Sequence, residues 1–381
     1  MGLLRLQDKH PHPHAAGLHR LLRRERLRRG ELRGEDGTGG DLRPQKLHPF
    51  DRRRPHPHLA PRIRLAQVSG RRGGRWEALL LLRIRPSGRL PRAEAQYSRA
   101  SMGYKLIALD LDGTLLTRSG EMSDRVLNAL ISALEKGVLI AICTGRRFAD
   151  VKRVLRELRA RIPLILHNGA MIAEFPSGDI IARFPIPPSK ASEAIKAMKR
   201  LGLNPFVYAL IDGEVRLICE NPLGMNPSAR RYVSNKMDAA LIVDELERLP
   251  DGEHLQIVAI DRREKVEEGL RALRGMAGIN VMTSGRVYDE GHWFLEILDG
   301  KASKAEALRF LSSLLGIPRE SIAAVGDNYN DIPMFRAAGL SFAMGNAPEE
   351  VRSAADRVAP SNEEDGAAWA IEEIISEEGG I

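Results

Sequence analysis

Cysteine is scarce in this chain, and aromatic side chains are few. Among 381 residues only Cys143 and Cys219 carry a thiol, and Phe, Trp and Tyr together make up 5%. Two cysteines exclude the disulfide framework of a small secreted protein, and neither has the neighbours of a zinc site. We therefore expect a reducing compartment, the cytoplasm. Cys143 lies inside the apolar run 138–143, which favours a core position over a reactive thiol.

Long hydrophobic runs are also absent. A helix that spans a bilayer needs about 20 consecutive apolar residues, and no run in this sequence approaches that length. Leu6 stands where a myristoylation signal has Ser or Thr. The sequence therefore predicts a protein with no membrane anchor.

Charge is distributed unevenly along the chain. Residues 1–101 contain 24 Lys and Arg against 9 Asp and Glu, whereas 102–381 carry a net charge of −7. A highly charged segment with scattered apolar residues buries too little apolar surface to offset its chain entropy. We expect 1–101 to be a disordered or artefactual basic extension, with Met102 as the natural start. The alternative is an Arg-rich arm that binds nucleic acid.

The remaining residues are numerous enough for two domains. The apolar runs 106–109, 138–143 and 163–166 indicate buried strands, and apolar residues at helical spacing follow Ser123 and recur in 151–158. Alternation of buried strands and helices predicts an α/β fold, a Rossmann-like parallel sheet covered on both faces. We place the first part of this core domain at 102–184.

The middle of the chain changes character. A proline-rich hinge at 185–188 precedes a helix and several strands, two of them joined by the hairpin turn Asp212-Gly213. We expect an α+β domain at 185–298, inserted into the core. The parallel pattern returns at 299–381, which we assign to the second part of the core domain.

Acidic and polar residues follow the predicted parallel strands. Asp110 and Asp112 come after the first strand, Thr144 after the second, and Asp327 and Asp331 after the strand 322–325. Ligands bind at the carboxyl edge of such a sheet, and carboxylates close together repel unless a cation offsets the charge. Oxygen ligands without thiolate suit Mg²⁺. The pattern predicts a magnesium site beside a phosphate.

A lysine supports this prediction. Ser303 and Glu306 have capping-box spacing, which puts Lys304 in the first turn of a helix, where a cation opposes the helix dipole. Local rules are broken in this way mainly where function requires it. Lys301 competes for the same role. Asn168, at the end of the strand 163–166, is a candidate contact at the same edge.

The residues 110–116, 144–146, Lys304 and 326–331, in this order, resemble the signature motifs of the haloacid dehalogenase superfamily. The inserted domain, with 345–347 and 364–366 near the end, resembles its Cof-type phosphatase branch. This resemblance implies that Asp110 is a nucleophile that forms an aspartyl-phosphate and that Asp112 is the acid and base. It also implies that Thr144 and Lys304 hold the phosphoryl oxygens, and that Mg²⁺ is bound by Asp110, the Asp112 carbonyl and Asp327, with Asp331 in support. We assign Gly145, Arg146 and Asn168, with Thr144, to substrate binding.

The resemblance implies a Mg²⁺-dependent phosphatase that hydrolyses phosphomonoesters of small metabolites. The inserted domain would be the cap that covers the substrate, with Arg146, His292 and Trp293 as candidate contacts. For His292 and Trp293 the alternative, which we favour, is a place in the core of the cap. A phosphomutase or phosphotransferase would share the nucleophile but return the phosphoryl group to an organic acceptor. The sequence leaves open which phosphorylated metabolite is the substrate, and it leaves the oligomeric state open.

Overall fold

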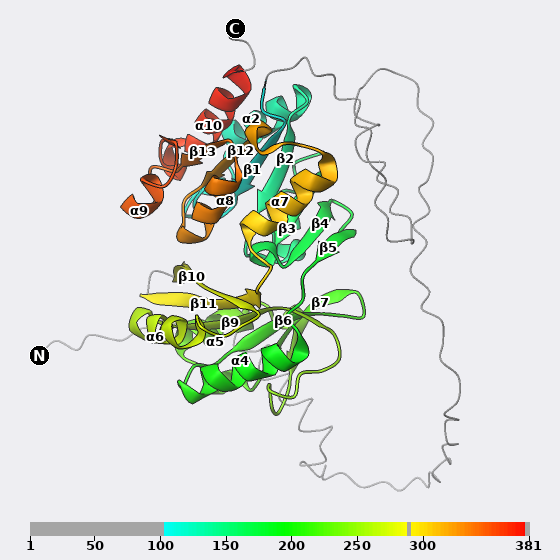
Figure 1. Cartoon of the computed structure of the whole chain (residues 1–381), viewed down its shortest axis with the longest axis vertical. Coiled ribbons are helices and arrows are strands. Elements are labelled where there is room, and N and C mark those ends of the chain that lie inside the picture. Colours follow the sequence, from blue (N-terminus) through cyan, green and yellow to red (C-terminus); the bar gives the residue numbers. More distant parts are fainter. Residues whose placement is uncertain (1–102, 288–290, 378–381) are drawn as a thin grey trace, which may run out of the picture. The chain divides into compact units, whose positions relative to one another are not determined.

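The computed structural model describes residues 103–287 and 291–377 (Figure 1). The predicted basic extension 1–101 therefore lies outside the described residues. Among the residues described, the strands form two separate sheets, one of eight strands and one of six.

The eight-stranded sheet has the order β14-β13-β12-β1-β2-β3-β4-β5. Neighbours from β14 to β3 are parallel, whereas β4 and β5 join at the β3 edge in antiparallel orientation. Every residue of β1, β2, β3 and β12 is buried, as expected for parallel strands covered on both faces. The strands are β1 (Leu106–Asp110), β2 (Leu139–Cys143), β3 (Ile162–Leu166), β4 (Met171–Phe175), β5 (Ile180–Arg183), β12 (Ile322–Gly326), β13 (Leu340–Ala343) and β14 (Arg357–Val358).

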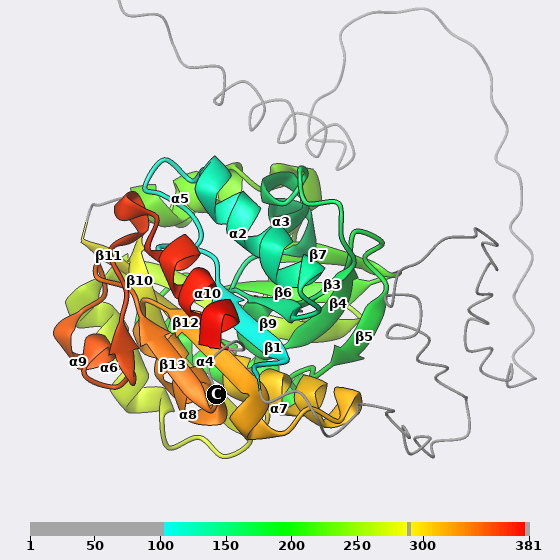
Figure 2. The same ribbon diagram turned by 90° about the horizontal axis from the view of Figure 1, so that it is seen from above.

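Helices cover both faces of this sheet. Helices α2 and α10 pack together on one face, and α7 packs with α8 on the other (Figure 2). The predicted cap of α2 is present, because the Ser123 hydroxyl accepts the N–H of Val126. The helices are α2 (Asp124–Glu135), α3 (Phe148–Val154), α7 (Lys304–Leu315), α8 (Ile332–Ala337), α9 (Glu349–Arg352) and α10 (Gly366–Ser376).

The six-stranded sheet has the order β10-β11-β9-β6-β7-β8. Its strands are antiparallel except for the pair β7 and β8. The strands are β6 (Phe206–Ile211), β7 (Glu214–Cys219), β8 (Ala240–Ile242), β9 (Glu253–Arg262), β10 (Ile279–Val287) and β11 (His292–Asp299), and the helices are α4 (Pro188–Arg200), α5 (Pro227–Ser234) and α6 (Arg263–Leu273).

Side chains of the six-stranded sheet alternate between two environments. In β11, Leu295 and Ile297 pack in one apolar cluster with residues of α4 and α6. Successive strand residues point to opposite faces, so Phe294 and Glu296 lie on the other face, where both line a cavity. Each fully buried aliphatic side chain stabilises the fold by roughly 2 kcal/mol. One face of this sheet is therefore packed with apolar side chains, and part of the other face lines the cavity.

Most elements were predictable, with some differences. The hairpin at Asp212 and Gly213 is present, with positive φ at both residues. The expected helix from 151 to 158 begins earlier and already ends at Val154. The antiparallel strands β4 and β5, helix α5 and strand β8 were not predicted.

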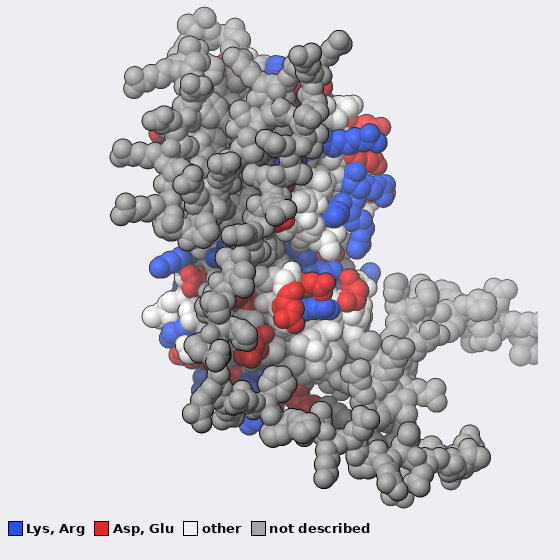
Figure 3. Space-filling model, turned by 90° about the vertical axis from the view of Figure 1, so that its right-hand side faces the viewer, with Lys and Arg blue, Asp and Glu red and all other residues white. Residues whose placement is uncertain are grey.

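On the face drawn in Figure 3, basic and acidic side chains of the described residues lie side by side.

Candidate active site

Three of the predicted carboxylates meet at the carboxyl edge of the eight-stranded sheet. Asp110 ends β1, Asp327 follows β12, and Asp331 ends the short 3₁₀ turn Tyr329–Asp331. Each offers one carboxylate oxygen, and these three atoms lie within 4.8 Å of one another. Asp331 is fully buried and Asp110 is 5% exposed. The parallel register of β1 and β12 thus brings together acids more than 200 residues apart in sequence.

Lys304 lies against this cluster. Its ammonium group donates to Asp110 Oδ1 at 2.5 Å and to Asp331 Oδ1 at 2.7 Å, and its side chain is 2% exposed. The Ser303 hydroxyl caps α7 by accepting the N–H of Glu306, as predicted. Lys301, the competing lysine, is exposed. The structure therefore places Lys304, and not Lys301, beside the acids.

Burial sets the protonation of these groups. Removal from water raises the pKa of Asp110 to about 7, with Lys304 opposing the rise and Asp331 and Asp112 adding to it. Burial and the charge of Asp110 likewise raise the pKa of Asp327 well above its ordinary value. The neighbouring carboxylates hold the pKa of Lys304 above its ordinary value despite its burial. The site is thus a lysine cation among acids that need further positive charge to remain ionised.

Asp331 has an internal role. One of its oxygens accepts from Lys304, and the other accepts the backbone N–H groups of Asp327 and Asn328, each at 3.0 Å. With both oxygens engaged, Asp331 orients the loop that carries Asp327 and also fixes the lysine. This geometry fits the supporting position that we predicted for it.

Asp112 points away from the three clustered acids. Its side chain is 56% exposed and forms a two-point ion pair with the guanidinium of Arg146, whose Nε lies 2.8 Å from Asp112 Oδ2. The carboxylate of Asp112 is therefore not part of the three-acid cluster. Only its backbone carbonyl remains as the metal ligand that we predicted at this residue.

Thr144, Gly145 and Asn168 gather beside the acids. Thr144 is 1% exposed and its hydroxyl oxygen accepts the N–H of Arg146, which leaves the hydroxyl proton for donation. A Cβ on Gly145 would lie 3.0 Å from the amide nitrogen of Asn168. Asn168 itself is buried, with a positive φ of 52°. These three residues, which we predicted to bind substrate, thus line one wall of a pocket.

Gly113 is required by a close approach. Its φ is +80°, and a Cβ built there would meet a carboxylate oxygen of Asp327 at 2.3 Å. Any side chain at this position would displace that acid. Asn346 further ties the loop down, because its amide donates to the carbonyl of Gly113 at 2.9 Å.

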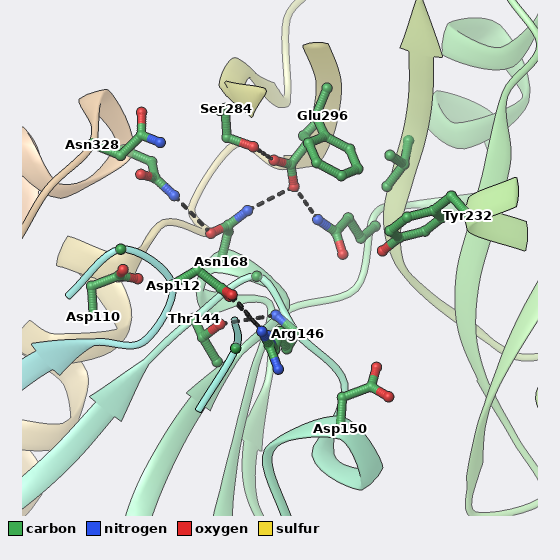
Figure 4. A pocket seen from close by; sticks show the side chains of 18 of the residues that line it. Asp110, Asp112, Thr144, Arg146, Asp150, Asn168, Tyr232, Ser284, Glu296 and Asn328 are labelled. Atoms are coloured by element: carbon green, nitrogen blue, oxygen red, sulfur yellow. Dashed lines mark hydrogen bonds and ion pairs between the residues drawn. The ribbon is translucent and has the colours of Figure 1, made fainter. Parts of the chain in front are cut away.

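These residues border a cavity of about 860 Å³ between the two sheets (Figure 4). Two groups of residues line this cavity. On the side of the eight-stranded sheet they are Asp110, Asp112, Thr144, Gly145, Arg146, Asn168, Lys304 and Asp327. On the side of the six-stranded sheet they are Tyr208, Tyr232, Lys236, Gln256, Ser284, Phe294 and Glu296. Arg146 thus lines the cavity, as we expected. His292 and Trp293 are not among its lining residues: Trp293 stacks under the guanidinium of Arg263 instead.

Sequence reasoning missed the cavity wall that the six-stranded sheet supplies. Gln256 lies between Leu255 and Ile257, and Glu296 lies between Leu295 and Ile297, so each interrupts an apolar stretch of a strand, which was a readable signal. It also missed Lys236, whose ammonium group lies 3.0 Å from Asp150 Oδ2. This contact joins the part of the chain that forms the six-stranded sheet to the part that forms the eight-stranded sheet. Pairing of residues so far apart in sequence leaves no local pattern.

The donor set fits a hard divalent cation. Asp110 and Asp327 are carboxylates with too little nearby positive charge, and Thr114 Oγ1 and Asn346 Nδ2 reach Asp327 only at 3.4 Å and 3.5 Å. Carboxylate oxygens with no thiolate or imidazole suit Mg²⁺. The residues present therefore fit magnesium.

Comparison with known proteins places the chain in a family. Residues 107–371 match the family model described as haloacid dehalogenase-like hydrolase. The phosphatase YwpJ of Bacillus subtilis (strain 168) is 31% identical over 71% of this chain and 100% of its own length. The 5-amino-6-(5-phospho-D-ribitylamino)uracil phosphatase YwtE of the same organism is 30% identical over 71% of this chain and 98% of its own. The chain belongs to the haloacid dehalogenase-like hydrolases, which confirms the resemblance of its motifs.

Solved structures agree. A haloacid dehalogenase-like hydrolase from Bacteroides thetaiotaomicron is 30% identical, with a TM-score of 0.59 over 71% of this chain and 99% of that one.

A more distant relative in sequence is the pyridoxal phosphate phosphatase YbhA of Escherichia coli (strain K12). It is 27% identical over 70% of this chain and 97% of its own length. The predicted α/β core is confirmed, and the predicted class of enzyme agrees with relatives that are named phosphatases.

Proposed function

We propose that this chain is a Mg²⁺-dependent phosphatase that hydrolyses phosphomonoesters of small metabolites through an aspartyl-phosphate on Asp110. The observation that carries the proposal is the contact of Lys304 with both Asp110 and Asp331 at the carboxyl edge of a parallel sheet. The names of the relatives, which include phosphatases for pyridoxal phosphate and for a ribitylamino-uracil phosphate, support the substrate class.

Asp110 supplies the nucleophile. A carboxylate attacks phosphorus only when ionised, and the ammonium of Lys304 at 2.5 Å favours that form. An oxygen of Asp110 forms a bond to phosphorus while the bond from phosphorus to the substrate oxygen breaks. The product of this step is an aspartyl-phosphate, and Lys304 offsets the charge that develops on the phosphoryl oxygens.

Asp112 transfers the proton. It lies two residues beyond the nucleophile on the same loop, and more than half of its side chain is exposed in the cavity region. In its carboxylic acid form Asp112 donates its proton to the leaving oxygen. The resulting carboxylate then takes a proton from the water that attacks phosphorus while the bond from phosphorus to the Asp110 oxygen breaks. Arg146 holds the Asp112 carboxylate through two hydrogen bonds and thereby orients it before the reaction.

The phosphoryl oxygens would be held by Thr144, the backbone of Gly145 and Lys304. These groups come from the end of β2 and the start of α7, and all line the cavity. Asn168 borders the same space, but its amide already donates to Glu296 and accepts from Asn330. The amide nitrogen of Asn168 carries two N–H groups, and the contact with Glu296 uses one of them. The other would donate to the substrate.

Asp110, Asp327 and the carbonyl of Asp112 would hold Mg²⁺, with Asp331 as the residue that positions Asp327. When bound, Mg²⁺ neutralises phosphate charge and keeps the clustered acids ionised. The raised pKa of both Asp110 and Asp327 in the protein alone supports this assignment, because these side chains lack sufficient positive charge from the chain itself.

The six-stranded sheet would act as the cap. We assign 102–184 and 299–381 to a split core domain and 185–298 to the cap. This division is supported by the strands, since 106–183 and 322–358 supply one sheet and 206–299 the other. A cap over the acids excludes water from the reacting phosphate and contacts the organic part of the substrate.

We also propose that the protein acts in the cytoplasm. Both cysteines are free and buried, which agrees with the cytoplasm. Among the residues that the structure describes, no helix has the length and apolar character needed to cross a membrane. The alternative of a nucleic-acid-binding arm concerns 1–101, which lie outside the described residues.

The test is a phosphate-release screen of the chain against a panel of phosphorylated metabolites, with Mg²⁺ and with a chelator. Release of inorganic phosphate from a phosphomonoester supports the proposal. Transfer of the phosphoryl group to a second position or to an organic acceptor, without phosphate release, favours a phosphomutase or phosphotransferase. Equal turnover by the Asp110→Asn variant overturns the assignment of the nucleophile.

A further inference from the structure

Glu296 is a buried carboxylate on the cavity wall opposite the acids. It lies in β11 between Leu295 and Ile297, which pack into the core of the six-stranded sheet. Glu296 is 4% exposed, and it lines the same cavity as Asp110. A carboxylate held there borders the space that the organic part of a phosphomonoester would fill (Figure 4).

Three hydrogen-bond donors converge on this carboxylate. The amide of Asn168 donates to Glu296 Oε2 at 2.6 Å, the amide of Gln256 donates to the same oxygen, and the Ser284 hydroxyl donates to Oε1. Asn168 lies in the 3₁₀ turn His167–Gly169 between β3 and β4, whereas Gln256 and Ser284 lie in strands of the six-stranded sheet. The carboxylate thus receives donors from both walls of the cavity.

The donors are themselves oriented. Asn330 donates to the amide oxygen of Asn168 at 3.1 Å, so the amide nitrogen of Asn168 faces Glu296. Gln256 Oε1 lies 3.0 Å from Nδ1 of His167. Burial lowers the pKa of His167 to about 4, so the ring is neutral and its Nδ1–H donates to Gln256. The network is arranged to receive a carboxylate.

All three donors are neutral, and among the described residues no ion pair reaches Glu296. A buried carboxylate without a cation is costly. A neutral glutamine could link the two walls without that cost. A carboxylate also accepts about four hydrogen bonds, so the three donors leave about one acceptor position. Both facts point to a further donor that arrives with a ligand.

We infer that Glu296 binds the organic part of the substrate by accepting a hydrogen bond from one of its O–H or N–H groups. Glu296 would then be the residue that makes this enzyme select phosphomonoesters with a hydroxyl or amino donor over esters without one. This inference rests on the proposed phosphatase function. The blander alternative is that Glu296 only joins the two walls of the cavity.

Glu296→Gln separates the two readings, because the variant keeps the shape and removes the charge. Steady-state kcat and KM are measured for three kinds of phosphomonoester. These are sugar and polyol phosphates, esters whose organic part carries an amino group, and phenyl phosphate, whose organic part has no hydrogen-bond donor. We expect kcat/KM for donor-bearing substrates to fall at least ~10-fold, since the variant loses a hydrogen bond to a charged group. For phenyl phosphate we expect a change below about twofold. The substrate arm that loses more identifies the donor as hydroxyl or amine.

Glu174→Gln is the matched control. Glu174 is another buried glutamate, 6% exposed, but it pairs with Arg161 and does not line the cavity. It reports the effect of neutralising a buried glutamate on folding alone, which thermal unfolding of each variant measures.

Deoxy substrates test the inference on the unaltered chain. Removing the relevant hydroxyl from a good substrate must reproduce the Glu296→Gln loss, and the variant must show no additional loss on that deoxy substrate. Equal losses on all substrates, or no loss on any, overturn the inference and leave the proposed function standing. If the unaltered chain releases phosphate from no ester, the proposed function fails, and the inference fails with it.

Discussion

Lys304 lies 2.5 Å from Asp110 although 194 residues separate them in sequence. The contact joins the end of β1 to the first turn of α7, where a cation is unfavourable to the helix dipole. That cost is offset because the lysine also reaches Asp331. Lys304 therefore lies within a buried acidic cluster and contacts the residue that we propose as the nucleophile.

Lys304→Met should strongly destabilise the metal-free protein. The substitution leaves Asp110 and Asp331 buried without their cation, which costs about 3–5 kcal/mol in the free energy of unfolding. The loss should be larger at pH 8 than at pH 5, because Asp110, with a pKa already raised to about 7, takes up a proton at the lower pH. Urea denaturation in the presence of a chelator measures it.

Lys301→Met is the control, because Lys301 is an exposed lysine three residues earlier. Its substitution should change the free energy of unfolding by less than about 0.5 kcal/mol. A similar loss in both variants would show that the contact with Asp110 has no special weight.

Removal of the metal should abolish turnover and lower thermal stability. Added Mg²⁺ should raise the Tm, because a ligand at 100 times its Kd adds about 2.7 kcal/mol to the free energy of unfolding. Asp327→Asn should lose most of this Mg²⁺-dependent rise, since Asp327 is one of the three clustered carboxylates. An undiminished rise in that variant would place the metal elsewhere.

His167 should set an acid limit on stability. Its pKa is about 4 in the folded protein against an ordinary value of 6.5. The unfolded chain therefore binds more protons between these pH values, so its contribution is complete above about pH 6.5 and is lost as the pH falls toward 4. The loss is about 3 kcal/mol, at 1.36 kcal/mol per pH unit.

His167→Asn should flatten that part of the stability curve, because asparagine retains a donor toward Gln256 and does not titrate there. Unfolding in urea between pH 4 and 7 gives both curves. Parallel curves for the two proteins would mean that another group causes the acid sensitivity.

The ion pair of Lys236 with Asp150 should favour the closed arrangement of the two sheets. Both side chains are mostly buried, at 15% and 13% exposure, and the pair borders the cavity. Lys236→Met should lower kcat/KM by about 5-fold, and high salt should lower the activity of the unaltered chain more than that of the variant.

Arg248→Ala supplies the comparison, since the Arg248 pair with Glu245 is exposed and lies outside the cavity. This variant should keep both the activity and the salt dependence of the unaltered chain. If Lys236→Met behaves as Arg248→Ala does, the pair has no part in closure.

The sequence was most informative where chemistry follows a strand directly. Asp110, Thr144 and Asp327 each come within two residues of a buried apolar run, and parallel pairing brings the ends of those runs together. Lys304 could be found because a cation in the first turn of a helix opposes the helix dipole. These positions depend on local pattern and on one topological rule, so a single sequence is enough to predict them.

The cavity wall of the six-stranded sheet was not predicted. Glu296 is placed by the register of β11 against β9, and its partner Asn168 lies in the turn that follows β3 of the other sheet. Antiparallel register and contacts between sheets follow from packing over long sequence distances. The same holds for β4 and β5, which look like any other short apolar segments until their pairing is known.

The central claim is that Asp110 becomes phosphorylated during turnover. Rapid acid quenching with ³²P-labelled substrate, followed by peptide mapping, tests it most directly. We predict hydroxylamine-sensitive label on the peptide that carries Asp110 and no label in the Asp110→Asn variant, whose turnover falls at least about a thousandfold. Phosphate release without labelled protein in the unaltered chain, or full turnover by Asp110→Asn, would contradict the account.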